Sequence, residues 1–212
     1  MRSAEGLLGA VLAGGGGRRF GGDKALALLN GRPLANWALD ALAGNVSRRV
    51  VISGRPRLSQ VLGVPVRGDT IPGSGPLGGL LTALEWAREE GREGVFLLAC
   101  DLPLVSREMV GKILEAWPSG SQAVVPESEG PLGAEPLCAG YGVECLPVVE
   151  GLLEEGELAM ERLLERTRVT RVEPEKLGSA DALRRAFTNV NTPADARRAG
   201  ELLRGQERGK GP

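Results

Sequence analysis

The chain has 212 residues, of which 25% are charged, and its net charge is −1. A chain of this length buries one good core and is too short for two comfortable domains, so we expect a single domain over residues 1–204. Residues 205–212 form a polar tail, which we expect to be disordered. Because the charges nearly cancel, no overall field attracts nucleic acid or a membrane surface, and neither is expected as a partner.

The sequence contains no histidine. This absence excludes Ser-His-Asp and Cys-His nucleophilic catalysis as well as any imidazole metal site. Three cysteines do not make a disulfide framework, and they are expected to be reduced in a cytoplasmic protein. The apolar run near the N-terminus is too short for a signal peptide, and no stretch approaches the roughly 18 apolar residues of a membrane span.

Strand and helix signals alternate through the first 125 residues. Apolar runs predict strands at residues 7–12, 50–52, 64–66, 94–100 and 123–125. Apolar residues at helical spacing predict helices at residues 34–42, 77–87 and 106–117. This alternation indicates an α/β protein with a doubly wound, mostly parallel sheet that carries helices on both faces.

The pattern is less regular in the second half. It predicts strands at residues 137–141, 169–172 and 187–190, and helices at residues 145–153 and 160–164. Thr192 and Asp195 form a capping box with proline at the first helical position, which predicts a last helix through Leu203. These segments are expected to add mixed strands and a cap to the parallel sheet.

A glycine-rich loop, residues 13–24, leaves the end of the first predicted strand. Four successive glycines allow backbone N–H groups to turn toward an anion. Three basic residues accompany the single acid Asp23; they are Arg18, Arg19 and Lys24. The loop therefore predicts a phosphate site, whereas a flexible linker is the alternative that the preceding strand and the fixed basic positions disfavour.

Two familiar phosphate loops do not match this spacing. A Walker A loop needs a hydroxyl after its lysine, and Ala25 follows Lys24. The dinucleotide fingerprint G-x-G-x-x-G fails because its third glycine falls on Arg19 or Phe20. The second predicted strand also ends on Ser53 instead of an acid, which argues again against a nicotinamide-binding domain.

Three loops are expected to meet at the carboxyl edge of the sheet, where open parallel sheets bind ligands. They are residues 13–24, 69–79 and 100–103. Asp101, directly after the most apolar strand, is the best magnesium candidate, since phosphate oxygens and water supply the other ligands of such an ion. Its alternative role is to cap the next helix or a turn.

Five motifs in chain order resemble those of the molybdenum cofactor guanylyltransferases. They are L-A-G-G at 12–15 with Arg19 and Lys24, G-P-L-G-G at 75–79, C-D-L-P at 100–103, E-P-L at 135–137 and N-V-N-T-P at 189–193. Gly17 and Phe20 depart from the serine and methionine of the family's first motif. The resemblance implies the Rossmann-like fold of nucleotide-diphospho-sugar transferases.

The same resemblance implies transfer of GMP from GTP to the phosphate of molybdopterin, with Mg²⁺ as the cofactor and pyrophosphate as the second product. The implied catalytic residues are Arg19, Lys24 and Asp101, of which Asp101 binds the metal. The implied nucleotide contacts are Leu12, Ala13, Gly14, Gly15, Lys24, Ser53, Asp69 and Asp101, and Ser53 stands where relatives have an asparagine. Asn189 and Asn191 are expected to orient the pterin substrate or to act as turn residues.

Such a reaction suits a chain without histidine, because a phosphomonoester with a second pKa of about 6 is already a nucleophile at neutral pH. Transient contact with cofactor-inserting proteins or molybdoenzymes is a further expected partnership. Three alternatives remain open from the residues alone: a cytidylyltransferase acting on the same cofactor, a sugar-phosphate nucleotidyltransferase, and a nucleotide-binding adaptor without turnover.

Overall fold

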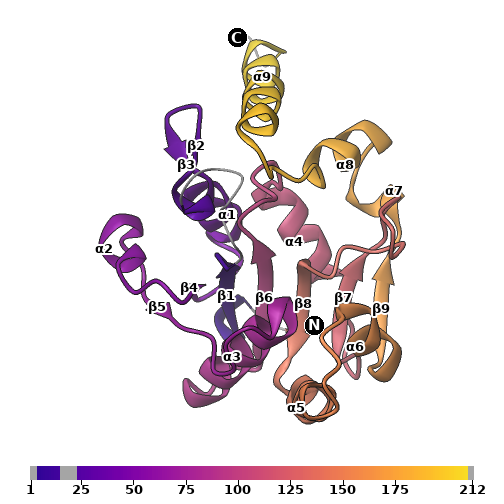
Figure 1. Ribbon diagram of the computed structural model, residues 1–212. Coiled ribbons are helices and arrows are strands. Elements are labelled where there is room, and N and C mark those ends of the chain that lie inside the picture. The colour runs from indigo at the N-terminus through magenta and orange to yellow at the C-terminus, as the bar shows by residue number, and fades with distance from the viewer. Residues whose placement is uncertain (1–3, 15–22, 210–212) are drawn as a thin grey trace.

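The structure, a computed structural model, describes residues 4–14 and 23–209, with side chains through residue 204. Within these residues the chain forms one seven-stranded sheet in the order β5-β4-β1-β6-β8-β7-β9 (Figure 1). The strands are β1 (Leu7–Leu12), β4 (Arg48–Ile52), β5 (Val66–Arg67), β6 (Gly94–Ala99), β7 (Ala123–Pro126), β8 (Cys138–Gly142) and β9 (Val169–Val172). The predicted mostly parallel α/β sheet is confirmed.

One strand runs against the others. β8 pairs antiparallel with both β6 and β7, while the other pairings in the sheet are parallel. At the centre, Leu12 is in register with Ile52 on one side and Ala99 on the other. Three parallel strands therefore end at the same level, and the loops that follow them share one edge of the sheet.

Helices cover both faces of the sheet (Figure 1). One face carries α1 (Leu34–Leu42), α4 (Arg107–Glu115), α7 (Pro174–Leu177) and α8 (Ala180–Ala186). The other carries α3 (Gly75–Glu89), α5 (Leu146–Glu154) and α6 (Met160–Arg166). The described residues also contain α2 (Leu58–Leu62), α9 (Pro193–Gly209) and the short 3-10 helices η1 (Ala4–Gly6), η3 (Lys24–Leu26) and η4 (Val143–Cys145).

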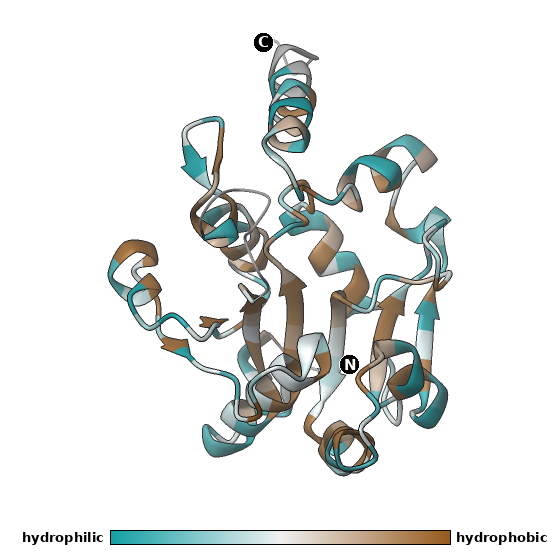
Figure 2. Ribbon diagram, viewed as in Figure 1, coloured by the Kyte–Doolittle hydropathy of each residue, from teal (hydrophilic) through white to brown (hydrophobic). Residues whose placement is uncertain are grey.

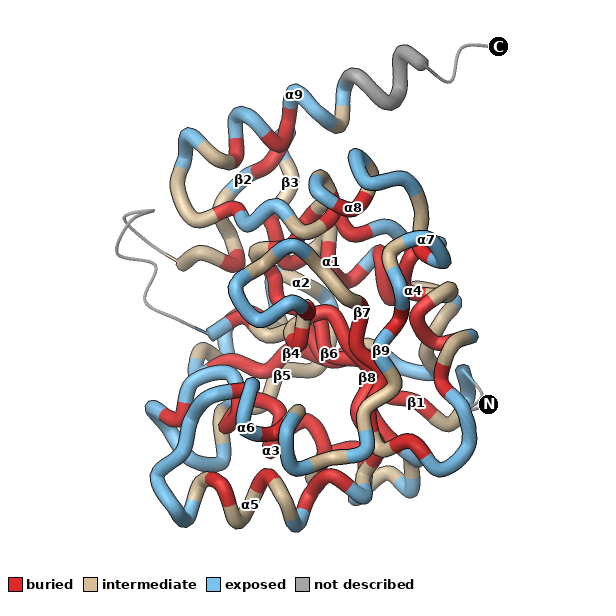
Figure 3. The backbone as a smooth tube through the Cα atoms, turned by 90° about the vertical axis from the view of Figure 1, so that its right-hand side faces the viewer, coloured by how far each residue is buried: buried red, intermediate tan, exposed pale blue. Residues whose placement is uncertain are grey.

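The central strands are apolar along their whole length because both of their faces are covered. In β1, Leu7 and Val11 pack into the cluster under α1 and α4, while Leu8 and Ala10 pack into the cluster under α3 and α5. Figure 2 shows the resulting hydrophobic centre, and the strands are buried in Figure 3. This two-sided burial is the physical reason for the unbroken apolar runs in the sequence.

A small hairpin, β2 (Leu28–Leu29) and β3 (Arg32–Pro33), follows η3. Asn30 and Gly31 turn it with φ values of 49° and 77°, the backbone that an Asn-Gly turn provides. The hairpin contributes to a third apolar cluster with α9, in which Leu29 packs near Ala199. Our sequence interpretation overlooked this hairpin, although its Asn-Gly turn signal is present.

Two predictions about the C-terminal part need correction. Residues 187–190 do not form a strand: Phe187 ends α8 with a backbone bond to Leu183, and Val190 makes a backbone bond to Asp101 at the sheet edge. Phe187 and Val190 are the two apolar residues of this segment, and each packs into an apolar cluster without entering the sheet. Two apolar residues that pack in this way resemble the ends of a short strand. The last helix continues to Gly209, past the expected end at Leu203 and into the predicted tail.

In the described part of the chain, no helix has the length and apolar character needed to cross a bilayer. Cys100, Cys138 and Cys145, the cysteines expected to be reduced, are buried, and none of the three is in a disulfide. The boundary between the domain and the tail remains a prediction.

Gly140 in β8 tests the packing between the sheet and α4. A Cβ atom at this position would lie 2.5 Å from Cζ3 of the buried Trp117. We expect Gly140→Ala to lower the free energy of unfolding by about 1 to 3 kcal/mol, because the strand and the ring must move apart.

The measurement is urea denaturation followed by far-UV circular dichroism. Gly151→Ala in α5 is the matched control, because nothing lies within 4 Å of its added Cβ atom and alanine favours the helix. It is expected to raise the free energy of unfolding by about 0.5 to 1 kcal/mol. Equal effects of the two substitutions would contradict this account of β8.

Candidate active site

A cavity of about 430 Å³ opens at the carboxyl edge of the sheet. Its wall includes residues from all three loops predicted to meet there, among them Leu12, Gly14, Lys24, Asp69, Gly79 and Asp101. The strand register explains this meeting, because β1 and β6 end side by side. The chain leaves these two strands in opposite directions along the sheet, toward β4 and toward β7, which is the usual position of a ligand crevice.

The side chain of Lys24 points into this edge and is held by two acceptors. Its Nζ atom donates to Oδ2 of Asp101 at 2.6 Å and to Oδ1 of Asn191 at 2.6 Å. The side chains of Lys24 and Asp101 are only 16% and 23% exposed. The contact brings together three of the predicted site residues and fixes a cation at the cavity wall.

The backbone around Asp101 is anchored on both sides. The Cys100 N–H donates to the carbonyl oxygen of Leu12 at 3.0 Å, and the Val190 N–H donates to the Asp101 carbonyl oxygen at 2.8 Å. Asp101 does not cap α4, since Ser106 accepts the N–H of Met109 at 3.1 Å. The helix-cap alternative for Asp101 is therefore excluded.

The capping box of α9 fixes Asn191. Asp195 Oδ2 accepts the Asn191 N–H at 3.1 Å and the Thr192 hydroxyl at 2.8 Å, while Thr192 Oγ1 accepts the Asp195 N–H at 3.1 Å. The predicted capping box is thus confirmed. It also positions the amide that binds Lys24, a link that our sequence interpretation did not include.

Asp69 places a second carboxyl group in the cavity. Burial raises the pKa of Asp69 above its ordinary value. Gly79 lies opposite, where a Cβ atom would be 2.8 Å from Cδ2 of Leu12 and 3.6 Å from Oδ1 of Asp69. Glycine at position 79 therefore keeps this side of the cavity open.

Thr82 holds the loop that carries Asp69, and our sequence interpretation overlooked it. Its fully buried hydroxyl accepts the Thr70 N–H at 2.8 Å and donates to the Gly78 carbonyl oxygen at 3.0 Å. The bond ties the residue after Asp69 to the first turns of α3. The sequence signal that could have revealed this role is the hydroxyl of Thr82 among the apolar residues of the helix predicted at residues 77–87.

Ser53 lies behind the cavity, and it is not among the described residues that line it. Its side chain is buried, and Oγ donates to the Ala13 carbonyl oxygen at 3.1 Å. The Ala13 N–H in turn donates to the Ile52 carbonyl oxygen at 3.0 Å. Ser53 therefore fixes the start of the glycine-rich loop, whereas Gly15 and Arg19 lie outside the described residues and their predicted roles stay predictions.

A second cavity of about 660 Å³ adjoins the first, and both are lined by Ala99, Asp101 and Leu137. It contains Asn189, so the two predicted asparagines have different positions: Asn189 lines the second cavity and Asn191 binds Lys24. Asp101 consequently lies where the two cavities meet.

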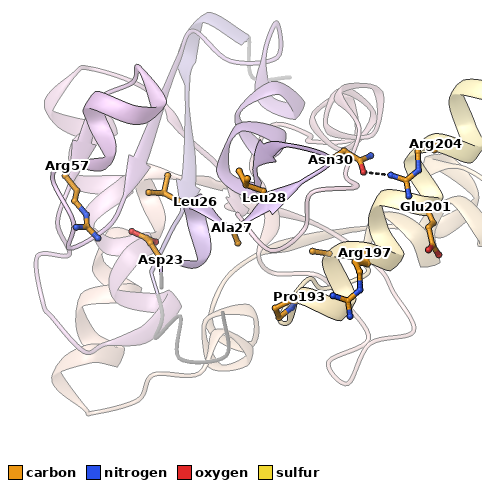
Figure 4. A pocket seen from close by; sticks show the side chains of 11 residues that line it. Asp23, Leu26, Ala27, Leu28, Asn30, Arg57, Pro193, Arg197, Glu201 and Arg204 are labelled. Carbon is orange, nitrogen blue, oxygen red and sulfur yellow. Dashed lines mark hydrogen bonds between the residues drawn. The ribbon is translucent and has the colours of Figure 1, made fainter. Parts of the chain in front are cut away.

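A third cavity, of about 670 Å³, lies between η3, the β2-β3 hairpin and α9 (Figure 4). Its described lining combines apolar residues such as Leu28 with charged ones, and Arg204 donates to Asn30 across it at 2.7 Å. Asp23, on its wall, is paired with Arg55 at 2.9 Å. None of the residues predicted to bind phosphate or metal is among its described lining residues.

The donor set of the first cavity fits a magnesium ion that is bound mainly by a nucleotide. The described residues contain no group of three or more carboxylate, cysteine or histidine side chains that could hold an ion by themselves. Mg²⁺ in nucleotide sites takes one or two carboxylates and completes its shell with phosphate oxygens and water. Asp101 and Asp69 both line the cavity and meet that need.

Cys100, beside Asp101, is not a nucleophile. Burial, followed by the charge of Asp101, raises the pKa of its thiol to about 12. The thiol is therefore neutral at physiological pH and unreactive. Among the described residues of the cavity, the other ionisable side chains are those of Lys24, Asp69 and Asp101.

The comparisons with known proteins agree with this geometry. The chain matches the MobA-like NTP transferase domain over residues 9–192. The chain belongs to this family. Because the matched range runs from β1 to the start of α9, it includes every element that forms the first two cavities.

Two curated relatives align with this chain over most of the length of both proteins. A probable molybdenum cofactor guanylyltransferase from Bacillus licheniformis is 37% identical over 191 residues, which are 87% of this chain and 92% of that protein. A molybdenum cofactor guanylyltransferase from Cereibacter sphaeroides is 34% identical over 201 residues, which are 93% and 97% of the two chains.

A solved structure has the same architecture. Molybdopterin-guanine dinucleotide biosynthesis protein A from Archaeoglobus fulgidus superposes with a TM-score of 0.77 at 28% identity, covering 93% of this chain and 99% of that one. The expected membership in the guanylyltransferase family and the expected fold are confirmed.

Thr82 provides a test of the cavity wall. We expect Thr82→Val to lower the free energy of unfolding by about 1 to 2 kcal/mol, because the Thr70 N–H loses its acceptor. The substitution is also expected to weaken nucleotide binding severalfold, since the loop with Asp69 is no longer tied to α3. Urea denaturation and nucleotide titration by calorimetry measure the two effects.

Thr82→Ser is the matched control, because it keeps the hydroxyl and removes only a methyl group. It is expected to bind nucleotide as the unmodified protein does. If the valine and serine variants bind nucleotide equally well, the hydroxyl does not position the Asp69 loop.

Proposed function

We propose that this protein is a molybdenum cofactor guanylyltransferase that transfers GMP from GTP to the phosphate of molybdopterin and releases pyrophosphate. The names of its relatives support this activity. The observation that carries the proposal is the Lys24–Asp101 pair at the junction of two adjoining cavities. A transferase needs such an arrangement, because two substrates must present their phosphates to each other.

In this proposal GTP occupies the first cavity, with its phosphates beside Gly14 and Lys24. The end of β1 and the N-terminus of α3 both face this cavity. Backbone N–H groups at a helix N-terminus favour anions. Molybdopterin occupies the second cavity, which is larger and more apolar. Its phosphate then meets the α-phosphate of GTP near Asp101.

The reaction is an in-line displacement at the α-phosphorus. An oxygen of the molybdopterin phosphate forms the new P–O bond, and the bond between the α-phosphorus and the oxygen that bridges to the β-phosphate breaks. The bonding electrons and the negative charge leave with pyrophosphate. No proton has to be removed from the nucleophile, because a phosphomonoester is largely a dianion at neutral pH.

Lys24 supplies positive charge where negative charge develops. Asp101 and Asn191 hold its ammonium group in place before substrate binds, so little reorganisation is needed in the transition state. Mg²⁺, which Asp101 and Asp69 would hold, neutralises charge on the phosphate oxygens when it is bound. Arg19, by its position in the glycine-rich loop, is proposed as a second cation for the triphosphate.

A cytoplasmic location and transient contacts with cofactor-inserting proteins or molybdoenzymes also belong to the proposal. The three buried cysteines, none of which is in a disulfide, are compatible with a reducing compartment. Delivery of a bound product to a further protein requires a contact of this kind.

The test of the function is pyrophosphate release with each of the four nucleoside triphosphates, in the presence of Mg²⁺ and with or without molybdenum cofactor. We expect release only with the cofactor, and fastest with GTP. If pyrophosphate is released with CTP as fast as with GTP, or faster, the guanylyl assignment is wrong and a cytidylyltransferase is favoured.

Lys24→Ala tests the role of the cation. We expect a loss of about 2 to 4 kcal/mol of transition-state stabilisation, by analogy with the loss of one donor to a developing oxyanion. This loss lowers the rate by roughly a hundredfold or more. Steady-state kinetics with GTP and cofactor measure the change, and thermal unfolding verifies that the variant is folded.

Arg88→Ala removes an exposed cation from α3 and is the control. Its activity is expected to match that of the unmodified protein. If the Lys24 and Arg88 variants show the same nucleotide binding and turnover, Lys24 does not contact the triphosphate.

A further inference from the structure

The second cavity combines a mostly apolar wall with a few charged side chains: the acids Asp101, Glu127, Glu129 and Glu135, and the cation Arg184. Among these acids, Glu135 is the one that a neighbouring hydroxyl holds in the wall. Leu183 and Phe187 line it from the α8 segment, and Glu135 lines it from the loop before β8. Glu135 is half-buried, and Asn189 contributes an amide. A flat, largely apolar ligand with a few polar atoms fits such a lining.

Glu135 is held rigidly in this wall. Its N–H donates to the Pro126 carbonyl oxygen at 3.0 Å, and its Oε1 atom accepts the Ser128 hydroxyl at 2.7 Å. Ser128 also accepts the Gly130 N–H at 3.1 Å, so the loop supports the position of its own hydroxyl. A carboxylate fixed in this way offers acceptor positions of defined direction to a ligand.

In the described part of the chain, the side-chain contact of Glu135 is with Ser128. Arg184, the cation on the wall of the same cavity, is paired with Glu129 and Asp181 instead. Burial, followed by the charge of Asp101, raises the pKa of Glu135, whereas the Ser128 hydroxyl opposes the shift. Two N–H donors from a ligand would stabilise the ionised form. Ionised carboxylates accept pairs of parallel N–H bonds and retain lone pairs beyond the one that a hydroxyl occupies.

The chemical group that matches is the 2-amino-4-oxopyrimidine edge of a pterin, which carries an exocyclic amino group next to a ring N–H. Both are donors that point the same way, and the ring is flat with apolar faces. The same cavity extends to Asp101, where the proposed reaction takes place. A ligand with this ring at Glu135 and a phosphate at Asp101 would span the cavity.

We propose that Glu135 determines acceptor specificity by accepting the 2-amino and ring N–H groups of the pterin, with Ser128 as its positioning residue. This inference rests on the proposed function and names how the acceptor is recognised. Asn189 and the apolar residues of the α8 segment contact the remainder of the ring system.

Pterin and lumazine test this assignment, because they differ at position 2: pterin has an amino donor there, whereas lumazine has an oxo acceptor and an additional N–H at N1. Binding to the unmodified protein is measured by the change in ligand fluorescence during titration. We expect pterin to bind about tenfold or more tightly than lumazine, because lumazine places an acceptor against the carboxylate. In Glu135→Gln, whose side-chain amide can donate to the oxo group, the ratio is expected to fall to about one or to reverse.

Turnover gives a second readout. In Glu135→Gln we expect the KM for the molybdenum cofactor to rise about tenfold, with kcat and the KM for GTP nearly unchanged, because the residue contacts only the acceptor ring. Glu161→Gln is the matched control, since Glu161 is an exposed acid on α6 that lines none of the three cavities described above. It is expected to keep the pterin preference of the unmodified protein.

Three outcomes would overturn the assignment: no pterin binding to the unmodified protein, equal binding of pterin and lumazine, or a folded Glu135→Gln variant that retains the original ratio. Failure of the proposed function would give a different combination of results. If the unmodified protein releases no pyrophosphate from GTP with cofactor and yet loses its pterin preference in Glu135→Gln, the guanylyl assignment fails and the role of Glu135 stands.

Discussion

The ion pair of Lys24 with Asp101, completed by the amide of Asn191, is the contact on which the site depends. It connects positions that are 77 and 167 residues apart in the chain. Both charged groups are largely shielded from water, so removing either partner leaves a charge without compensation, which is costly in a partly buried setting. The pair therefore joins the glycine-rich loop, the end of β6 and the start of α9 into one unit.

The elements behind this contact make it rigid. Backbone bonds link the chain after β6 to Leu12 on one side and to Val190 on the other. The capping box of α9 holds Asn191, and Ser53 holds the carbonyl group of Ala13 at the start of the loop. Groups that are already in place before substrate binds stabilise developing charge without having to reorganise. Such preorganisation is usually the largest single contribution to catalysis when charge develops in the transition state.

Two cavities meet at Asp101, and in the proposed mechanism they divide recognition between the two substrates. The first is the smaller one, and glycines border it, such as Gly79, where a Cβ atom would meet Leu12. The second is larger, more apolar, and carries Glu135 on its wall. In the proposed mechanism, nucleotide selection and acceptor selection therefore rest on largely separate walls, and Asp101 is the charged residue that lines both cavities.

The sequence by itself determined the central strands, the covering helices α1, α3, α4, α5 and α6, and the three loops at the carboxyl edge, because burial on both faces and helical periodicity are local properties of the chain. It also pointed to Asp101, which directly follows a predicted strand, to Lys24 through the basic glycine-rich loop, and to Asp69 through the family resemblance. The tertiary structure alone decided the antiparallel direction of β8, the role of residues 187–190 as a crossing segment, and the contact of Asn191 with Lys24. It likewise placed Ser53 behind the loop and Thr82 under Asp69. These features arise from hydrogen bonds between residues distant along the chain, and no local pattern of apolar and polar residues specifies such partners.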